Sequence, residues 1–253
     1  MTAIVIVSQP RFGCVHIGTD AAIYREHEGV VAFGNKVVPI AHLSAAITGA
    51  GNASAGALLG RSFGCEFTSW DDVVERAPAV LPMLTKSYGL PNGAVMILAG
   101  ISKKRGAEAY SFSLDDSLPP DTTRAEMEAS EYHAAPFQFV KLPDHVNTPV
   151  PPAEIIQAAN FEGFDADEDP DVVRWSILKL LTMQRAMPLP DGIGGIGGFA
   201  EITTVSESEI TQRIVKRWPD KIGAPLRPEP IDWSRWCAQN PKPKTRRPAL
   251  RVV

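Results

Sequence analysis

The sequence predicts an α+β fold, because its strands and helices are grouped along the chain instead of alternating. Short β-branched or apolar runs come first, at residues 3–7, 13–20, 29–33, 36–40 and 43–48. Two helical segments follow, then a hairpin, a third long helix and two final strands. The length of 253 residues and the hydrophobic content of 44% are enough for one sizeable core, so one large domain is expected.

The opening segment is predicted to be a hairpin that continues into a sheet. Residues 3–7 and 13–20 have the composition of two strands joined by a turn. The first helix is expected after Gly51, with Asn52 as its N-cap. Residues 53–63 favour this helix because they are rich in Ala and Leu and poor in β-branched side chains.

A second helix is expected to run to Leu84 from Ser69, whose side chain can cap the first turn. Pro78 and Pro82 lie inside this segment and are expected to shorten or kink the helix. A second hairpin is predicted within residues 94–114, around a polar turn of Ser, Lys, Arg and Gly.

The later part of the body is less regular. Residues 115–170 are acidic and rich in proline, and we interpret them as a divergent insertion with a strand at 137–142 and a short helix at 153–159. The helical spacing of apolar side chains predicts a helix at 171–187. Two antiparallel strands are expected to complete the domain, at 199–205 and 210–218.

The charge distribution suggests a boundary near Trp218. Residues 1–218 are expected to form the domain, and residues 219–253 a basic, proline-rich C-terminal tail, within an overall formal charge of −4. Such a tail cannot form its own core, so it is expected either to be disordered or to lie along a partner chain.

Composition argues against several classes of protein. The negative overall charge disfavours a nucleic-acid coat. The basic tail leaves nucleic-acid binding as a minor alternative, since its bases are interleaved with few aromatic residues beyond Trp233 and Trp236. Cys14, Cys65 and Cys237 are odd in number and widely spaced, which predicts free thiols and neither a disulfide framework nor a metal site.

The chain shows no targeting or membrane signal. It begins with an apolar run that has no basic leader, and no stretch approaches the roughly 20 apolar residues of a membrane span. We therefore expect a protein that is made in the cytoplasm, is not secreted and makes no membrane contact.

No cofactor is expected. Residues 192–197 match the glycine pattern of a dinucleotide-binding loop, but a helix precedes them and a strand follows, which reverses the required context. We interpret them as a turn. His16 and His42 have no partner at metal-ligand spacing and are expected to be hydrogen-bonded residues at strand ends.

A threonine at position two offers one kind of catalysis. Its hydroxyl is a weak nucleophile unless a base lies beside it, and an N-terminal threonine supplies that base as its own α-amino group, with a pKa near 8. Initiator methionine is usually removed before so small a residue. Removal of Met1 would free the amine of Thr2.

Four short motifs follow one another near the start of the sequence: residues 2–5 (Thr-Ala-Ile-Val), 17–20 (Ile-Gly-Thr-Asp), 35–40 (Asn-Lys-Val-Val-Pro-Ile) and 46–55 (Ala-Ile-Thr-Gly-Ala-Gly-Asn-Ala-Ser-Ala). In order and spacing they resemble the opening of proteasome β-subunits and of their bacterial homologue, the proteolytic partner of a two-component heat-shock protease. With the hairpin at 94–114 and the segment 196–199, the resemblance covers roughly two-thirds of the chain. It implies a four-layer αββα sandwich of the N-terminal-nucleophile (Ntn) hydrolase type.

The resemblance also implies roles for particular residues. Thr2 would be the nucleophile, Lys36 the cation that favours its deprotonation, and Asp20 the residue that orients Lys36. A backbone N–H group at Gly49 or Gly51 would stabilise the oxyanion, and the sequence does not choose between them. Taken singly, Asp20 is better explained as a turn residue that closes a strand, and Lys36 as an exposed cation at the start of one.

Two features depart from the family pattern. The family has a serine after the central hairpin and an Asp-x-x-Ser-Gly motif before the late strand, and neither is present. Ile196 stands at the place of the second serine, and Asp191 is out of register for the aspartate. In addition, a retained Met1 would block the amine of Thr2 in a peptide bond.

These departures favour a catalytically silent relative of the family that serves as an assembly or structural component. A bacteriophage virion, for example its tail, is a concrete setting, because proteasome-like chains also occur in bacteriophage genomes. The expected partners are other protein chains, in a homo-oligomer to which residues 219–253 contribute contacts. The alternative is an active threonine peptidase or amidohydrolase that works as a ring oligomer after removal of Met1.

Overall fold

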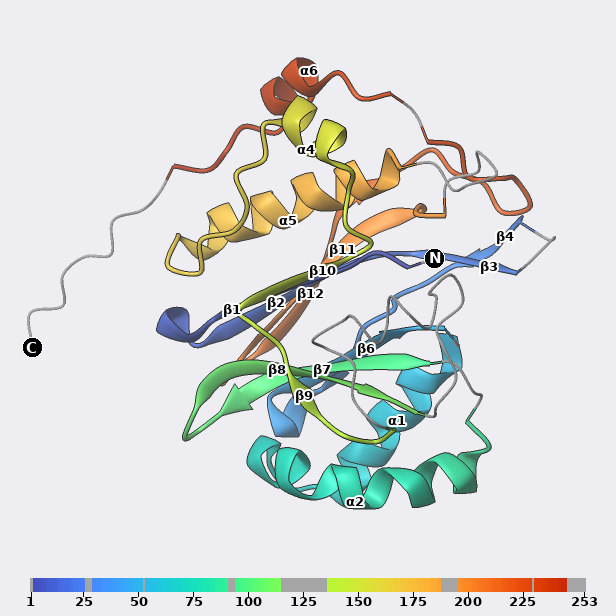
Figure 1. The fold of residues 1–253 in the computed structure, drawn as a ribbon, viewed down its shortest axis with the longest axis vertical. Helices are drawn as coiled ribbons and strands as arrows, with labels where there is room; N and C mark the ends of the chain where they lie inside the picture. Colours follow the sequence, from blue (N-terminus) through green and yellow to red (C-terminus); the bar gives the residue numbers. More distant parts are fainter. Residues whose placement is uncertain are drawn as a thin grey trace, which may run out of the picture.

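The structure is a computed structural model that describes residues 2–25, 29–51, 53–90, 94–114, 136–187, 195–228 and 230–244. These residues form two five-stranded antiparallel sheets, a separate two-stranded sheet and five α-helices (Figure 1). The prediction of an α+β fold is confirmed.

The first sheet is built around the opening hairpin. Its strands are β1 (Ile4–Gln9), β2 (Cys14–Asp20), β10 (His145–Thr148), β11 (Phe199–Ser206) and β12 (Ile210–Arg217). They lie in the order β10-β1-β2-β11-β12. Strand β11 therefore pairs with β2 of the first hairpin, about 180 residues away along the sequence, and β12 pairs with β11.

The second sheet follows the same antiparallel plan. Its strands are β5 (Val38–Ile40), β6 (Ala45–Ala50), β7 (Val95–Ser102), β8 (Gly106–Ser113) and β9 (Val140–Lys141), in that order across the sheet. The two-stranded sheet pairs β3 (Ala22–Arg25) with β4 (Gly29–Phe33). The strand expected at 137–142 is reduced to the two residues of β9, because Phe137 has a positive φ of 65° and turns the chain just before it.

The helices lie on the outer faces of the two large sheets (Figure 1). They are α1 (Ala53–Glu66), α2 (Trp70–Tyr88), α4 (Ala153–Ala159), α5 (Pro170–Arg185) and α6 (Trp233–Gln239). Short 3₁₀ turns, Pro10–Phe12 and Ala41–Leu43, join β1 to β2 and β5 to β6.

Three apolar clusters show how the two large sheets and the helices pack against one another. Ile4 and Ile6 of β1 belong to a cluster between the two sheets, which also contains Ile97 of β7. Val5 and Val7 point the other way and belong to a cluster beneath α5, because successive side chains of a strand alternate between its faces. The third cluster lies between the second sheet and the helices α1 and α2.

The prolines of α2 were expected to shorten or kink it, and shortening does not occur. Ser69 caps it as predicted, with its hydroxyl accepting a hydrogen bond from the Asp72 N–H at 3.2 Å. The helix nevertheless continues for 19 residues past both Pro78 and Pro82 to Tyr88. The reason is its apolar stripe, whose members Trp70, Val73, Ala77, Leu81 and Leu84 are all buried, so packing offsets the lost backbone hydrogen bonds.

In the described part of the tail, residues 219–228 and 230–244, several side chains pack against the rest of the chain. Trp236 of α6 is only 7% exposed, and its ring lies 5.7 Å from that of Trp175 in α5. The Trp175 Nε1–H donates to the Asn240 carbonyl at 2.7 Å. The sequence analysis noted Trp233 and Trp236 only as aromatic residues among the bases, and it did not predict that they supply an apolar face for packing.

The stretch interpreted as an insertion contributes to both sheets. Residues 136–170 include β9, which pairs with β8, and β10, which pairs with β1. The short helix expected at 153–159 is α4. Among the residues that the structure describes, no helix is both long and apolar enough to cross a membrane.

Candidate functional site

The register of the opening hairpin places the second residue of the chain beside the end of β2. Ile4 of β1 lies opposite Thr19 of β2, so the residues that precede β1 run alongside Asp20. The Ala3 N–H donates to Asp20 Oδ1 at 3.0 Å. This bond fixes the start of the chain and holds Thr2 at the same edge of the sheet.

Lys36 links the two other predicted residues. Its Nζ lies 2.6 Å from Asp20 Oδ1 and 3.4 Å from Thr2 Oγ1. The Lys36 side chain is 10% exposed and that of Asp20 is fully buried, so the ion pair is largely shielded from water. Thr2, Asp20 and Lys36 are therefore brought together as the sequence analysis required.

The Asp20 carboxylate is held from four directions. Besides Lys36, three backbone N–H groups donate to it: Ala3 at 3.0 Å, Ala22 at 3.2 Å and Gly197 at 3.1 Å. These groups come from the start of the chain, the segment after β2 and the segment before β11. Such a carboxylate has little freedom to rotate, and it fixes the position of the Lys36 ammonium in turn.

The Gly197 contact belongs to a turn that we call the glycine turn, residues 196–198. Gly198 has a φ of +78°, and a Cβ atom there would lie 2.4 Å from the ring of Phe33. A Cβ atom on Gly197 would lie 2.6 Å from Asp220 Oδ2. Both positions therefore require glycine, one for backbone conformation and close approach and the other for close approach alone.

Gly49 and Gly51 lie at the end of β6. Thr48 of this strand donates its hydroxyl to the Lys36 carbonyl at 3.0 Å, which places this end of β6 against the Lys36 segment. Gly49 is inside the ladder opposite Met96, whereas Gly51 follows the strand with a φ of +100°. The role of the Gly49 or Gly51 N–H group as an oxyanion donor stays a prediction.

Ile196 occupies the position at which the sequence resemblance expects a serine. Ile196 is 2% exposed and belongs to the apolar cluster beneath α5. Asp191 lies outside the described residues.

The buried His16 is not part of this site. It lies inside β2 and not at a strand end as expected, but it is hydrogen-bonded as predicted, because its ring nitrogens lie 2.9 Å from Thr204 Oγ1 and 3.0 Å from Gln9 Oε1. Burial, together with the nearby charge of Arg174, lowers the pKa of His16 to about 3. Burial also raises the pKa of the neighbouring Cys14 thiol to about 11, so the pair is neutral and neither acts as a base or a thiolate at neutral pH.

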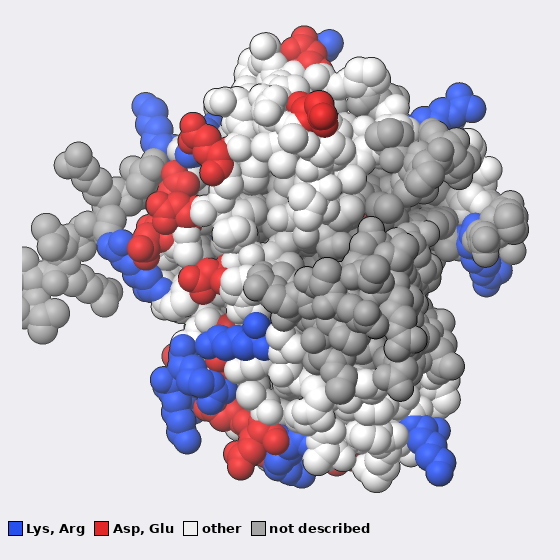
Figure 2. All heavy atoms as spheres, viewed as in Figure 1, with Lys and Arg blue, Asp and Glu red and all other residues white. Residues whose placement is uncertain are grey.

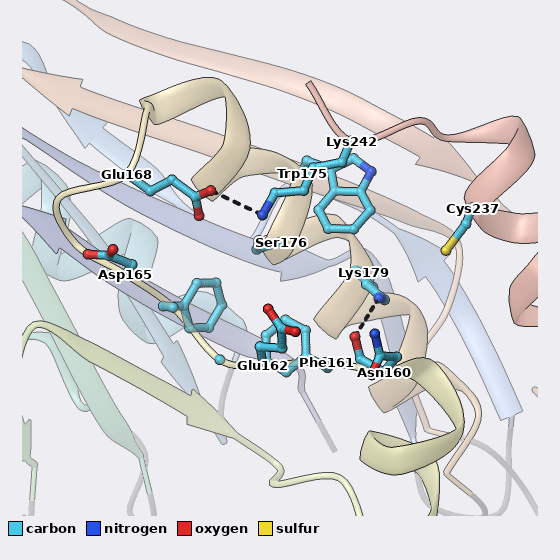
Figure 3. A pocket seen from close by; sticks show the side chains of 12 residues that line it. Asn160, Phe161, Glu162, Asp165, Glu168, Trp175, Ser176, Lys179, Cys237 and Lys242 are labelled. Atoms are coloured by element: carbon cyan, nitrogen blue, oxygen red, sulfur yellow. Dashed lines mark hydrogen bonds and ion pairs between the residues drawn. The ribbon is translucent and has the colours of Figure 1, made fainter. Parts of the chain in front are cut away.

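A hollow of about 590 Å³ lies on another part of the molecule, between α4, α5 and the tail (Figure 3). None of the predicted site residues lines it. The Lys179 ammonium at its wall donates to the carbonyl of Asn160 at 3.1 Å and lies over the ring of Trp175. This buried cation already has partners in the C-terminal end of α4 and the aromatic ring. We therefore interpret the hollow as a gap between packed elements and not as a ligand site.

On the face seen in Figure 2, Lys and Arg side chains lie close to Asp and Glu side chains along the left of the view, whereas those on the right stand apart from any visible Asp or Glu. The described residues contain no group of three or more His, Cys, Asp or Glu side chains that could hold a metal ion. A comparison of the chain with models of protein families and with curated proteins finds no match.

Proposed function

We propose that the chain is an Ntn hydrolase of the proteasome type, with a four-layer αββα sandwich. The packing supports this proposal: α5 covers one face of the first sheet, the two sheets face each other, and α1 and α2 cover the second sheet. The position of Thr2 at the end of a central strand supports it as well, because β1 has paired strands on both sides.

We further propose that the protein is an N-terminal threonine peptidase or amidohydrolase, active after Met1 is removed. A single observation carries this proposal: Lys36 Nζ lies 3.4 Å from Thr2 Oγ1 and 2.6 Å from the buried Asp20 carboxylate. An ammonium held so close to a hydroxyl stabilises the alkoxide that develops during attack.

In the proposed reaction, the free α-amine of Thr2 takes the hydroxyl proton as Oγ1 bonds to an amide carbonyl carbon. The N–H group at Gly49 or Gly51 stabilises the oxyanion. The amine then returns the proton to the leaving nitrogen as the C–N bond breaks, which leaves an ester on Thr2. Water hydrolyses this ester, releases the acid and restores the hydroxyl.

A catalytically silent assembly component, for example in a bacteriophage virion or tail, is the second candidate. The buried Ile196, at the place where the resemblance puts a serine, favours it, because a nucleophile without its supporting polar groups loses activity. Both candidates include a homo-oligomer, and residues 219–253 would contribute contacts to neighbouring chains.

An electrophilic peptide epoxyketone, which bonds to both the hydroxyl and the amine of an N-terminal threonine, tests the choice. We expect the wild type to lack Met1 by intact-mass measurement and to gain one inhibitor. The matched variants are Thr2→Ala, which should gain none, and Thr2→Ser, which should still be labelled; Met1 is cleaved before either small residue. A retained Met1, or equal labelling of wild type and Thr2→Ala, would reject the enzyme and leave the assembly component.

A further inference from the structure

The segment after β12 reaches back to the proposed catalytic site. We propose that Asp220, together with Arg185 at the end of α5, is a positioning residue that holds the glycine turn (residues 196–198) against Asp20. The inference rests on the proposed function, because it assigns Asp220 a part in the reaction of Thr2. It also places a residue of the expected tail in the support of the site.

Asp220 forms a direct hydrogen bond with the glycine turn. Its Oδ2 accepts a hydrogen bond from the Gly198 N–H at 2.7 Å. The neighbouring Trp218 N–H donates to the Gly198 carbonyl at 3.0 Å. Two successive contacts from the end of β12 therefore hold both polar groups of Gly198.

Arg185 adds further hydrogen bonds to Asp220 and to the turn, and we call Arg185 and Asp220 together the clamp. Its two terminal nitrogens donate to the two oxygens of Asp220 at 2.9 and 2.7 Å. The same Nη1 also donates to the Ile196 carbonyl at 2.7 Å, and the guanidinium lies over the ring of Trp218. The guanidinium plane is thus fixed by a carboxylate, a carbonyl and an aromatic face.

The clamp and the site meet at Gly197. Its N–H donates to Asp20 Oδ2 at 3.1 Å, and its carbonyl accepts from the Ala21 N–H at 3.1 Å. Since Asp20 in turn holds Lys36, a shift of the glycine turn changes the position of the ammonium next to Thr2. The approach is close, because a Cβ atom on Gly197 would lie within 3.0 Å of both Asp220 and Arg185.

A second ion pair of the tail provides a contrast. Lys242 Nζ lies 3.0 Å from Glu168 Oε1, with side chains that are 49% and 26% exposed, and it borders the hollow beside α5 (Figure 3). It touches no residue of the glycine turn. The Arg185 and Asp220 side chains are instead 10% and 8% exposed. A pair so buried is weak evidence for added stability, whereas its contacts on both sides of Gly197 suit a role in positioning.

The test compares Asp220→Ala and Asp220→Asn with the control Lys242→Gln, which removes the other ion pair. The first measurement is hydrogen exchange of the Gly197 amide by NMR. We expect protection to fall about tenfold or more in Asp220→Ala, because the turn loses its hold. Asp220→Asn keeps one acceptor oxygen and should give an intermediate loss, and it serves alone if the alanine variant does not fold.

The second measurement is the rate of Thr2 labelling by the epoxyketone as a function of inhibitor concentration. We expect the maximal rate to fall by about tenfold to a hundredfold in Asp220→Ala, with half-saturation unchanged, because the fault lies in the alignment of the reacting groups. Lys242→Gln should match the wild type in both measurements.

The two proposals fail in different ways. An unlabelled wild type would reject the hydrolase, while the Gly197 exchange would still report whether Asp220 holds the turn. If Asp220→Ala and Lys242→Gln show the same Gly197 exchange and the same labelling rate as the wild type, Asp220 has no positioning role and the inference is overturned.

Discussion

Removal of Asp20 is expected to destabilise the protein more than removal of its partner Lys36. The two substitutions are Asp20→Asn and Lys36→Met, which keep the approximate volume of each side chain. Both break the same 2.6 Å ion pair. They differ in what they leave behind, because the Asp20 carboxylate has four donors, whereas the Lys36 ammonium donates to Asp20 and Thr2 among the residues described.

The hydrogen bonds of Asp20 determine how much the two variants differ in unfolding free energy. In Asp20→Asn, one carboxylate oxygen becomes an NH₂ group, so two of the four donors face another donor whichever way the amide is turned. Unsatisfied buried donors and a largely buried, unpaired ammonium together should cost about 2–4 kcal/mol. In Lys36→Met the carboxylate keeps three backbone N–H groups, and we expect a loss of about 1–2 kcal/mol.

Urea unfolding at neutral pH, followed by tryptophan fluorescence and by circular dichroism, measures both losses. The double variant Asp20→Asn/Lys36→Met completes a cycle and should be more stable than Asp20→Asn alone, because it removes the unpaired ammonium. The reasoning is refuted if Lys36→Met is the more destabilised single variant, or if Asp20→Asn unfolds at the wild-type urea concentration.

Two further predictions concern the fold. Burial alone would raise the pKa of Glu108, but hydrogen bonds from Arg105 and Trp70 hold this pKa below its ordinary value. The Glu108 carboxylate therefore stabilises the fold at neutral pH, and its contribution is lost as pH falls below about 4.5. The difference in unfolding free energy between wild type and Glu108→Gln should shrink between pH 6 and 3, and a constant difference would contradict this. Gly100→Ala would place a Cβ atom 2.4 to 2.7 Å from three ring atoms of the buried Trp70, so it should lower the unfolding free energy by about 1–3 kcal/mol, measured by thermal or urea unfolding. The control is Gly56→Ala in α1, whose Cβ atom would have its nearest neighbouring atom at 3.6 Å, and it should leave the unfolding free energy unreduced.

The elements that sequence analysis located well are those with local signals. The hairpin of β7 and β8 has an apolar run on each side of a polar turn, and α2 begins at Ser69 because a hydroxyl there satisfies a backbone donor. Helix α4 coincides with the expected residues 153–159. In each case the residues that decide the structure are near neighbours in the chain.

The residues of the candidate site also fall into two groups, those that are close in the sequence and those that are distant. Thr2, Asp20 and Lys36 all lie within the first 36 residues, and the antiparallel register of one hairpin is enough to bring the first two together. The donors from Gly197 and the clamp of Arg185 and Asp220 come from much later in the sequence. No local pattern marks Arg185 and Asp220, because their contacts with the glycine turn arise only when the chain folds.

The same contacts bear on the boundary drawn near Trp218. That boundary separates a basic segment from an acidic body, which is a property of composition. The structure instead ties the two sides together: Arg185 on one side pairs with Asp220 on the other, and the buried side chain of Leu226 lies close to Gly197. A chain that ended at Trp218 would leave the Arg185 guanidinium buried without its carboxylate, next to the turn that supports Asp20. The proposed catalytic residues therefore depend on the tail segment for their geometry, although none of them belongs to it.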